Sequence, residues 1–239
     1  MVGVHSGCLV LVNARHPIRD TSRPALAPAA PGSGVLLEKR ASAMLTGALE
    51  RLGAVGEIVP VSGYRSEAEQ REIWDSSMAE NGEDFTRKFV AAPGCSEHQT
   101  GLAIDLALRA EDIDFIRPDF PYDGVCGRFR EIAPDYGFIE RYPAGKEDIT
   151  GIAAEPWHFR YVGRPHARLM RDMGLTLEEY VEFLRGYPYP GRLLSTSNGG
   201  YDALIGFACS YEPEEHRAPC QVSGNNVDGY ILTLWRLPA

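Results

Sequence analysis

The stretch SEHQTGLAID at residues 96–105 combines a histidine, a glycine and an aspartate within an apolar run. Gly101 allows a tight passage of the backbone, so we expect His98 on a loop or short turn and a strand over residues 102–108. Asp105 then has an aliphatic residue on each side in a strand that otherwise reads as buried. A carboxylate there is costly unless it is paired or bound to a metal, which favours a metal ligand over a solvated side chain.

A second polar group lies in the segment EPWH at residues 155–158. Its aromatic-rich, alternating continuation predicts a strand over residues 155–162, with His158 on one face and Glu155 at its entry. Pro156 argues against the helical HExxH arrangement, in which the ligands fall one turn apart. In an extended segment Glu155 and His158 point in different directions, which suits a base near a metal better than a second ligand.

Together the two segments supply two imidazoles and two carboxylates. A catalytic zinc ion takes about three nitrogen or oxygen ligands from the protein and keeps a further position open for water. His98, Asp105 and His158 would fill the ligand positions. Hydrolysis also needs a base that takes the proton of the water and later delivers it to the leaving amine, and Glu155 is the candidate.

Arg65 and Gln70 are placed by the start of a predicted helix. Ser66 and Glu69 form a capping-box pattern, which predicts a helix that runs to about residue 80. Arg65 lies just ahead of its first turn and Gln70 lies a little over one turn further along, so both side chains could reach one pocket. The alternative is a surface arginine and a solvated glutamine.

The composition predicts a folded chain that does not bind nucleic acid. With 239 residues, 44% of them hydrophobic, the chain can bury a substantial core as one large domain or as a domain with an appendage. Its formal net charge is −9, and no run of Lys and Arg could neutralise successive phosphates. Small or cationic substrates remain open.

The cysteine pattern and the apolar segments predict a cytoplasmic protein. The five cysteines are odd in number and lack CxxC spacing, which fits a reducing compartment. The short apolar piece at residues 8–12 has no preceding basic cluster and no cleavage site, so we do not expect a signal peptide. No segment approaches the roughly 20 apolar residues of a membrane span. A leader or anchor outside the given sequence is left open.

Periodicity and turn signals predict mixed helices and strands, followed by a change of character at residue 187. The predicted helices cover residues 35–53, 66–80, 128–133, 164–173 and 176–186, the predicted strands cover residues 7–13, 57–62, 102–108, 137–142 and 155–162, and loops are expected at 15–34 and 81–95. Short strands at 192–196, 203–209 and 230–235, joined by tight turns, follow. We therefore predict a main domain over residues 1–186 and a small β extension over residues 187–239 packed on it.

The three motifs GYRS at residues 63–66, SEHQTGLAID at 96–105 and EPWH at 155–158 resemble, in this order, the VanY/VanXY family of zinc D,D-peptidases. This family is associated with peptidoglycan trimming and vancomycin resistance, and the match covers roughly residues 9–184. The resemblance implies a hedgehog-like α+β fold, with a central antiparallel sheet flanked by helices. It also implies a small peptide substrate that ends in D-alanine.

The resemblance also implies a role for each matching residue. His98, Asp105 and His158 would bind zinc and Glu155 would be the catalytic base. Arg65 would stabilise the developing oxyanion or hold a substrate carboxylate. Further substrate contacts are implied for the residues Arg65, Gln70 and Ser96, and also for Tyr142 and Trp157.

The implied activity is that of a zinc-dependent D,D-carboxypeptidase that hydrolyses the terminal D-Ala-D-Ala bond of peptidoglycan precursors or stem peptides. Three alternatives keep the same fold: a D-Ala-D-Ala dipeptidase or bifunctional enzyme, an L-Ala-D-Glu endopeptidase, and a non-catalytic protein that binds cell-wall peptides. Glu155 argues against the last of these, because a purely structural metal site needs no base beside its ligands. In a further alternative the histidines and acids only pack or hydrogen-bond, which leaves their order in the motifs unexplained.

Overall fold

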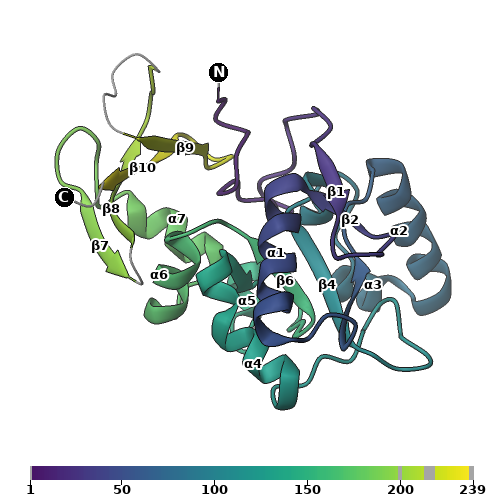
Figure 1. Ribbon diagram of the computed structural model, residues 1–239. Helices are drawn as coiled ribbons and strands as arrows, with labels where there is room; N and C mark the ends of the chain where they lie inside the picture. Colours follow the sequence, from purple (N-terminus) through teal and green to yellow (C-terminus); the bar gives the residue numbers. More distant parts are fainter. Residues whose placement is uncertain (1, 199–200, 213–218, 237–239) are drawn as a thin grey trace.

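The computed structural model describes residues 2–198, 201–212 and 219–236. Figure 1 shows two antiparallel sheets, with helices packed around the first sheet and between the two. The central sheet has the strand order β3-β4-β6-β5 and the second sheet has the order β7-β8-β10-β9. A two-stranded ribbon, β1-β2, completes the β structure of the described chain. The fold is therefore the mixed α+β architecture that the resemblance implied.

The strands are short, and each sheet is antiparallel throughout. In chain order the strands are β1 (Leu26–Pro28), β2 (Leu36–Glu38), β3 (Ile58–Ser62), β4 (Ala103–Leu108), β5 (Phe138–Glu140), β6 (His158–Tyr161), β7 (Leu194–Asn198), β8 (Tyr201–Ala208), β9 (Cys220–Gly224) and β10 (Tyr230–Arg236).

The helices lie mainly between these strands. In chain order they are α1 (Lys39–Leu52), α2 (Glu67–Asn81), α3 (Glu83–Phe89), the 3-10 helix η1 (Glu97–Thr100), α4 (Gly124–Ile132), the 3-10 helix η2 (Ala133–Tyr136), α5 (Glu147–Thr150), α6 (His166–Met173) and α7 (Leu177–Leu184). Within the described ranges, none of them is both long and apolar enough to span a membrane.

The central sheet sends apolar side chains to one face and polar side chains to the other. β4 pairs with β6 so that Ile104 lies opposite Phe159 and Asp105 lies opposite His158. Successive side chains of a strand point to opposite faces. Ile104 and Phe159 enter the hydrophobic core, to which α1 contributes Leu49. The register therefore brings Asp105 and His158 together on the opposite face.

The second sheet packs against the main body through α6 and α7, which lie between the two sheets in Figure 1. Ile205 of β8 and Ile231 of β10 belong to the same buried hydrophobic cluster as Leu49 and Ile104. The division of the chain into residues 1–186 and 187–239 stays a prediction, since a shared core and a separate sheet are both present.

The prediction of a strand over residues 7–13 is wrong, although the segment is buried as expected. Its backbone groups bond to side chains and a loop instead of a neighbouring strand. The Arg160 guanidinium donates to the carbonyls of Cys8 and Val10, and a backbone amide of the segment donates to the Ser223 hydroxyl. The buried apolar run therefore satisfies its hydrogen bonds without a ladder.

Several element boundaries also differ from the sequence prediction. The predicted helix 35–53 begins at Lys39, because residues 36–38 form β2 and pair with β1, which lies in the predicted loop 15–34. Helix α3 lies in the predicted loop 81–95, and β9 was not predicted. Strand β6 begins only at His158, so that Glu155 lies on the turn that precedes it.

Candidate metal centre

Three elements bring His98, Asp105 and His158 together in a buried cluster. His98 lies on η1, which ends at Gly101 in the left-handed conformation (φ 72°), so that the chain turns directly into β4. Asp105 and His158 face each other across β4 and β6. One potential ligand atom from each of the three residues lies within 4.8 Å of the others. The sequence prediction that these residues meet is confirmed.

The Asp105 carboxylate lies between the two imidazoles. Its Oδ2 is 3.2 Å from Nε2 of His98 and its Oδ1 is 2.9 Å from Nδ1 of His158. The ring centroids of the two histidines are 5.0 Å apart and their planes are nearly perpendicular. His98 therefore presents its Nε2 to the cluster, whereas His158 presents its Nδ1.

The orientation of the His98 ring is fixed by the backbone. Its Nδ1 donates to the carbonyl of Gly63 over 2.7 Å. Because a carbonyl can only accept, the proton of the neutral imidazole is on Nδ1 and Nε2 is unprotonated. This is the arrangement that a metal-binding histidine needs.

Burial and neighbouring charges set the protonation of the cluster. Burial and the nearby Arg65 lower the pKa of His98 to about 4, so its ring is neutral at pH 7. Burial alone would raise the pKa of the Asp105 carboxyl, but the two adjacent imidazoles hold it below its usual range. Burial would also lower the pKa of His158, but its contacts with Asp105 and Glu97 raise it to about 9.

The three side chains form a donor set that fits a metal ion, although the structure contains no metal. Two imidazole nitrogens and one carboxylate converge, which is a ligand set typical of catalytic zinc. Asp105 Oδ1 is buried and has no hydrogen bond of acceptable geometry from any residue that the structure describes. A buried carboxylate oxygen without a hydrogen bond is costly, and a cation between the three residues would satisfy it.

Glu155 lies beside this cluster rather than in it. Its Oε2 is 3.6 Å from Nδ1 of His158, and the side chain is buried. The backbone fixes the turn, since the Glu155 amide donates to the Tyr142 carbonyl and the Glu155 carbonyl accepts from the His158 amide. Burial raises the pKa of the Glu155 carboxyl to about 8, against the lowering effect of His158. Glu155 can therefore hold a proton near neutral pH.

The cluster faces a cavity of about 50 Å³, which is also lined by Arg65, Gln70 and Ser96. Nη2 of Arg65 is 3.7 Å from Oδ2 of Asp105. Gln70 is buried and its amide group donates to the Ala91 carbonyl. Its Oε1 accepts no hydrogen bond from the described part of the chain. The alternative of a surface arginine and a solvated glutamine is therefore wrong.

Tyr142 and Trp157, for which the resemblance implied substrate contacts, also line this cavity. Sequence reasoning assigned no role to Phe115 and Ile116, which reach the cavity from the loop after β4. It also assigned none to Glu97, a buried acid next to His98. The position of Glu97 in the motif was visible, but its burial depends on partners elsewhere in the chain.

Comparison with known proteins defines the class. The structure superimposes with a TM-score of 0.93 on the vancomycin resistance D,D-dipeptidase VanXYg, crystallised with a D-Ala-D-Ala phosphinate analogue, at 47% identity over 98% of this chain and 95% of that one. A second match is a mutant of the D,D-pentapeptidase VanY from a VanB-type resistance cassette in complex with Zn(II) (TM-score 0.63, 34% identity, 73% of this chain and 98% of that one). The fold is thus that of the D-Ala-D-Ala peptidases, a class of hydrolases.

The sequence comparisons agree with this class. The VanXYC protein of Enterococcus gallinarum, a bifunctional D-Ala-D-Ala dipeptidase and carboxypeptidase, is 44% identical over 179 residues, which cover 74% of this chain and 94% of that relative. The family model of VanY, D-alanyl-D-alanine carboxypeptidase, matches residues 37–164. The chain belongs to the VanY family.

Proposed function

We propose that the chain is a zinc-dependent D,D-carboxypeptidase that removes the terminal D-alanine from peptidoglycan precursors or stem peptides. His98, Asp105 and His158 would hold the zinc ion. The observation that carries the proposal is the place of Glu155, a buried carboxylate that contacts the cluster at 3.6 Å without belonging to it. Family membership and the relatives that act on D-Ala-D-Ala support the same substrate class.

The reaction is hydrolysis of the last peptide bond. When bound, zinc supplies Lewis-acid polarisation of a carbonyl and a water of lowered pKa, about 7. Glu155 takes the proton of the attacking water while the new C–O bond forms. The same carboxyl then delivers this proton to the leaving amine as the C–N bond breaks, and free D-alanine departs. The raised pKa of Glu155 suits both steps, because the group accepts and returns a proton near pH 7.

The surrounding side chains suit a peptide carboxyl terminus. Arg65 offers a fixed cation for the terminal carboxylate or for the oxyanion that develops at the scissile carbonyl. Oε1 of Gln70 can accept from a substrate amide, and Ser96 adds a hydroxyl to the same cavity. These contacts would orient the terminal D-residue.

A D-Ala-D-Ala dipeptidase, alone or together with the carboxypeptidase, is the second candidate, since the VanXYC relative carries both activities.

Support for longer substrates comes from a hollow of about 670 Å³ that shares Arg65 and Phe115 with the cavity of the ligand cluster. It extends along Gly63 and Tyr64 to Val35 and offers room for residues that precede the scissile bond.

We also place the protein in the cytoplasm. All five cysteines are unpaired thiols, which fits a reducing compartment. Immunoblots of cytoplasmic and extracytoplasmic fractions from the native cell would test this location, and recovery outside the cytoplasm would contradict it.

Metal analysis and product release test the proposed function. The purified protein should contain about one zinc ion per chain and release D-alanine from a pentapeptide ending in D-Ala-D-Ala. Glu155→Gln should keep the metal and lower kcat about 10²–10⁴-fold, because only the proton carrier is removed. Glu147→Gln, an exposed acid on α5, is the matched control and should keep full activity.

Other outcomes would contradict particular assignments. Full activity in Glu155→Gln would show that another group is the base, and zinc retained by His98→Ala combined with His158→Ala would show that the metal binds elsewhere. Rates on free D-Ala-D-Ala and on the pentapeptide separate the two candidate activities. Cleavage of an L-Ala-D-Glu bond without release of D-alanine would contradict both activities and indicate an L-Ala-D-Glu endopeptidase.

A further inference from the structure

A group of four charges, three of them buried and the fourth partly exposed, lies behind His158. It consists of Glu97 on η1, Arg141 after β5, Arg160 on β6 and Glu178 on α7. Glu97 is 1% exposed and both arginines are 0% exposed. Removing the three buried charges from water costs several kcal/mol per ion before their mutual attraction is counted. Their opposite signs explain how the group is tolerated, but not why it lies against a histidine of the metal centre.

Arg141 donates a hydrogen bond to one oxygen of Glu97 and Arg160 forms an ion pair with the same oxygen, so the other oxygen is left to face His158. Oε1 lies 2.8 Å from Nε of Arg141 and 2.7 Å from Nη1 of Arg160. Oε2 lies 3.7 Å from Nε2 of His158. Throughout the described ranges, neither Oε2 nor this Nε2 has a hydrogen-bond partner. Two unsatisfied buried atoms, one an acceptor and the other able to donate, therefore face each other.

Both arginines are themselves held in place. Arg141 makes two parallel bonds of 2.8 and 2.7 Å to the Glu178 carboxylate. Arg160 donates to the carbonyls of Cys8 and Val10 over 3.1 and 2.8 Å. Two fixed arginines therefore hold the Glu97 carboxylate in place. A movement of less than about 1 Å would bring its Oε2 to hydrogen-bonding distance from Nε2 of His158.

We propose that Glu97 is the positioning residue for His158: its Oε2 accepts a hydrogen bond from Nε2–H, which keeps the ring proton on Nε2 and leaves Nδ1 unprotonated and aimed at the metal site. A neutral imidazole carries one proton, and a carboxylate can only accept. Glu97 acts on His158 as the Gly63 carbonyl acts on His98. This inference rests on the metal site of the proposed function.

Glu97→Gln tests the inference with little change of shape. The amide can keep an oxygen toward the arginines, but it then turns its NH₂ group to His158 and favours the tautomer with the proton on Nδ1. We expect zinc affinity to fall about 10–100-fold, measured by competition with a chelator of known affinity. The matched control is Glu178→Gln, which also removes one carboxylate from the charge group, but at a partly exposed residue that pairs with Arg141 and not with His158. It should lower stability and leave zinc affinity within about 2-fold of the wild type.

A spectroscopic measurement gives the answer even where Glu97→Gln folds poorly. Long-range ¹H–¹⁵N correlation spectra of the zinc-loaded wild type should show His158 protonated on Nε2 and metal-bound through Nδ1. The inference is overturned by a proton on Nδ1, or by equal zinc affinity in Glu97→Gln and Glu178→Gln. A wild type that binds no zinc at residues 98, 105 and 158 contradicts the proposed function itself, so the two failures are distinguishable.

Discussion

At the scale of single residues, Arg65 brings a fixed positive charge to the edge of the ligand cluster. Its side chain is largely buried, and its Nε has no hydrogen-bond partner within the structure's described segments. We expect Arg65→Lys to lower kcat/KM about 10²-fold or more, because an ammonium cannot present two parallel donors to a carboxylate or oxyanion. Steady-state kinetics on a peptide ending in D-Ala-D-Ala measures this effect.

The matched control for Arg65→Lys is Arg71→Lys on α2. Arg71 pairs with Glu67 at the surface, where both side chains are 60% exposed, so activity should not change. If the kinetics of Arg65→Lys were also unchanged, Arg65 would have no role in binding the substrate or its oxyanion.

The meeting of the three candidate ligands could be predicted from sequence, whereas the residues that orient them could not. The aliphatic neighbours of Asp105 indicate a role for it, because a carboxylate in an apolar strand is costly unless it is paired or bound to a metal. Arg160 lies in an equally buried strand, but its burial is explained by Glu97 on a distant segment and by the carbonyls of residues 8 and 10. Local pattern carries no information about such partners.

At the scale of elements, prediction succeeded where the signal was local. The predicted capping box of Ser66 with Glu69 is formed and α2 begins after it, and the helix predicted from residue 176 begins at a second capping box, of Thr176 with Glu179. It failed for residues 7–13, where an apolar run typical of a strand bonds to side chains instead. Strand pairing is a long-range property, so composition alone could not separate the two outcomes.

Helix α4 contributes an arginine that ties the turn of Glu155 to the loop after β4. Nη2 of Arg130 donates to the Pro156 carbonyl over 2.6 Å and to the Phe120 carbonyl over 2.9 Å. Its Nε donates to Glu140 over 2.8 Å, and its guanidinium stacks on Tyr122. The carbonyl next to the proposed base is thus held by a residue outside the cavity.

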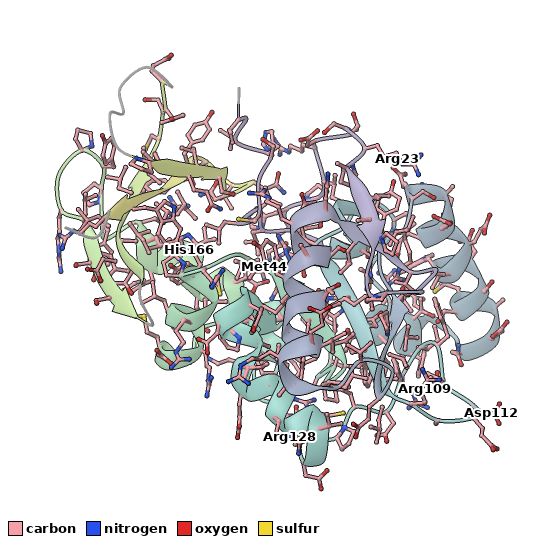
Figure 2. All side chains as sticks on the ribbon, in the orientation of Figure 1. Arg23, Met44, Arg109, Asp112, Arg128 and His166 are labelled. Carbon is pink, nitrogen blue, oxygen red and sulfur yellow. The ribbon has the colours of Figure 1, made fainter. Side chains whose placement is uncertain are left out.

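We expect Arg130→Lys to lower kcat about 10-fold and stability by about 2–3 kcal/mol, since one ammonium cannot make these bonds together. Zinc content should stay the same. Arg128→Lys is the matched control, because Arg128 lies exposed on the same helix (Figure 2). An Arg130→Lys enzyme that is less stable but has normal kcat would show that the arginine supports only the fold.

At the scale of the whole molecule, the shared hydrophobic cluster bears on the proposed division at residue 187. Ile205 and Ile231 of the second sheet are buried in one cluster with the core of the main body. We propose that residues 187–239 are an extension and do not unfold independently. Tryptophan fluorescence and far-UV circular dichroism should then follow one coincident thermal transition. Two resolved transitions would show that the second sheet is an autonomous unit.

His166 joins the extension to the main body. Figure 2 labels it near α6, where this helix approaches the second sheet. The ring is fully buried, and its Nδ1 and Nε2 lie 2.8 and 2.9 Å from the hydroxyls of Tyr180 on α7 and Thr233 on β10. Sequence reasoning assigned this histidine no role, since both partners lie on other elements. Its protonation state therefore affects how the sheet is attached.

Acid should weaken this attachment as soon as the pH falls below 6.5. Burial lowers the pKa of His166 to about 3, whereas the unfolded chain has a value of about 6.5. Below pH 6.5 the unfolded state binds the proton and the folded state does not. The contribution of His166 to stability is therefore complete well above pH 6.5 and falls as the pH decreases toward 3, with a total loss of about 2 kcal/mol by pH 5. Urea unfolding at these pH values should show a smaller loss for His166→Gln than for the wild type. The control variant Tyr180→Phe keeps the buried His166 ring, so it should be less stable at every pH but lose stability with acid as steeply as the wild type. If His166→Gln lost stability just as steeply, the acid sensitivity would belong to other groups.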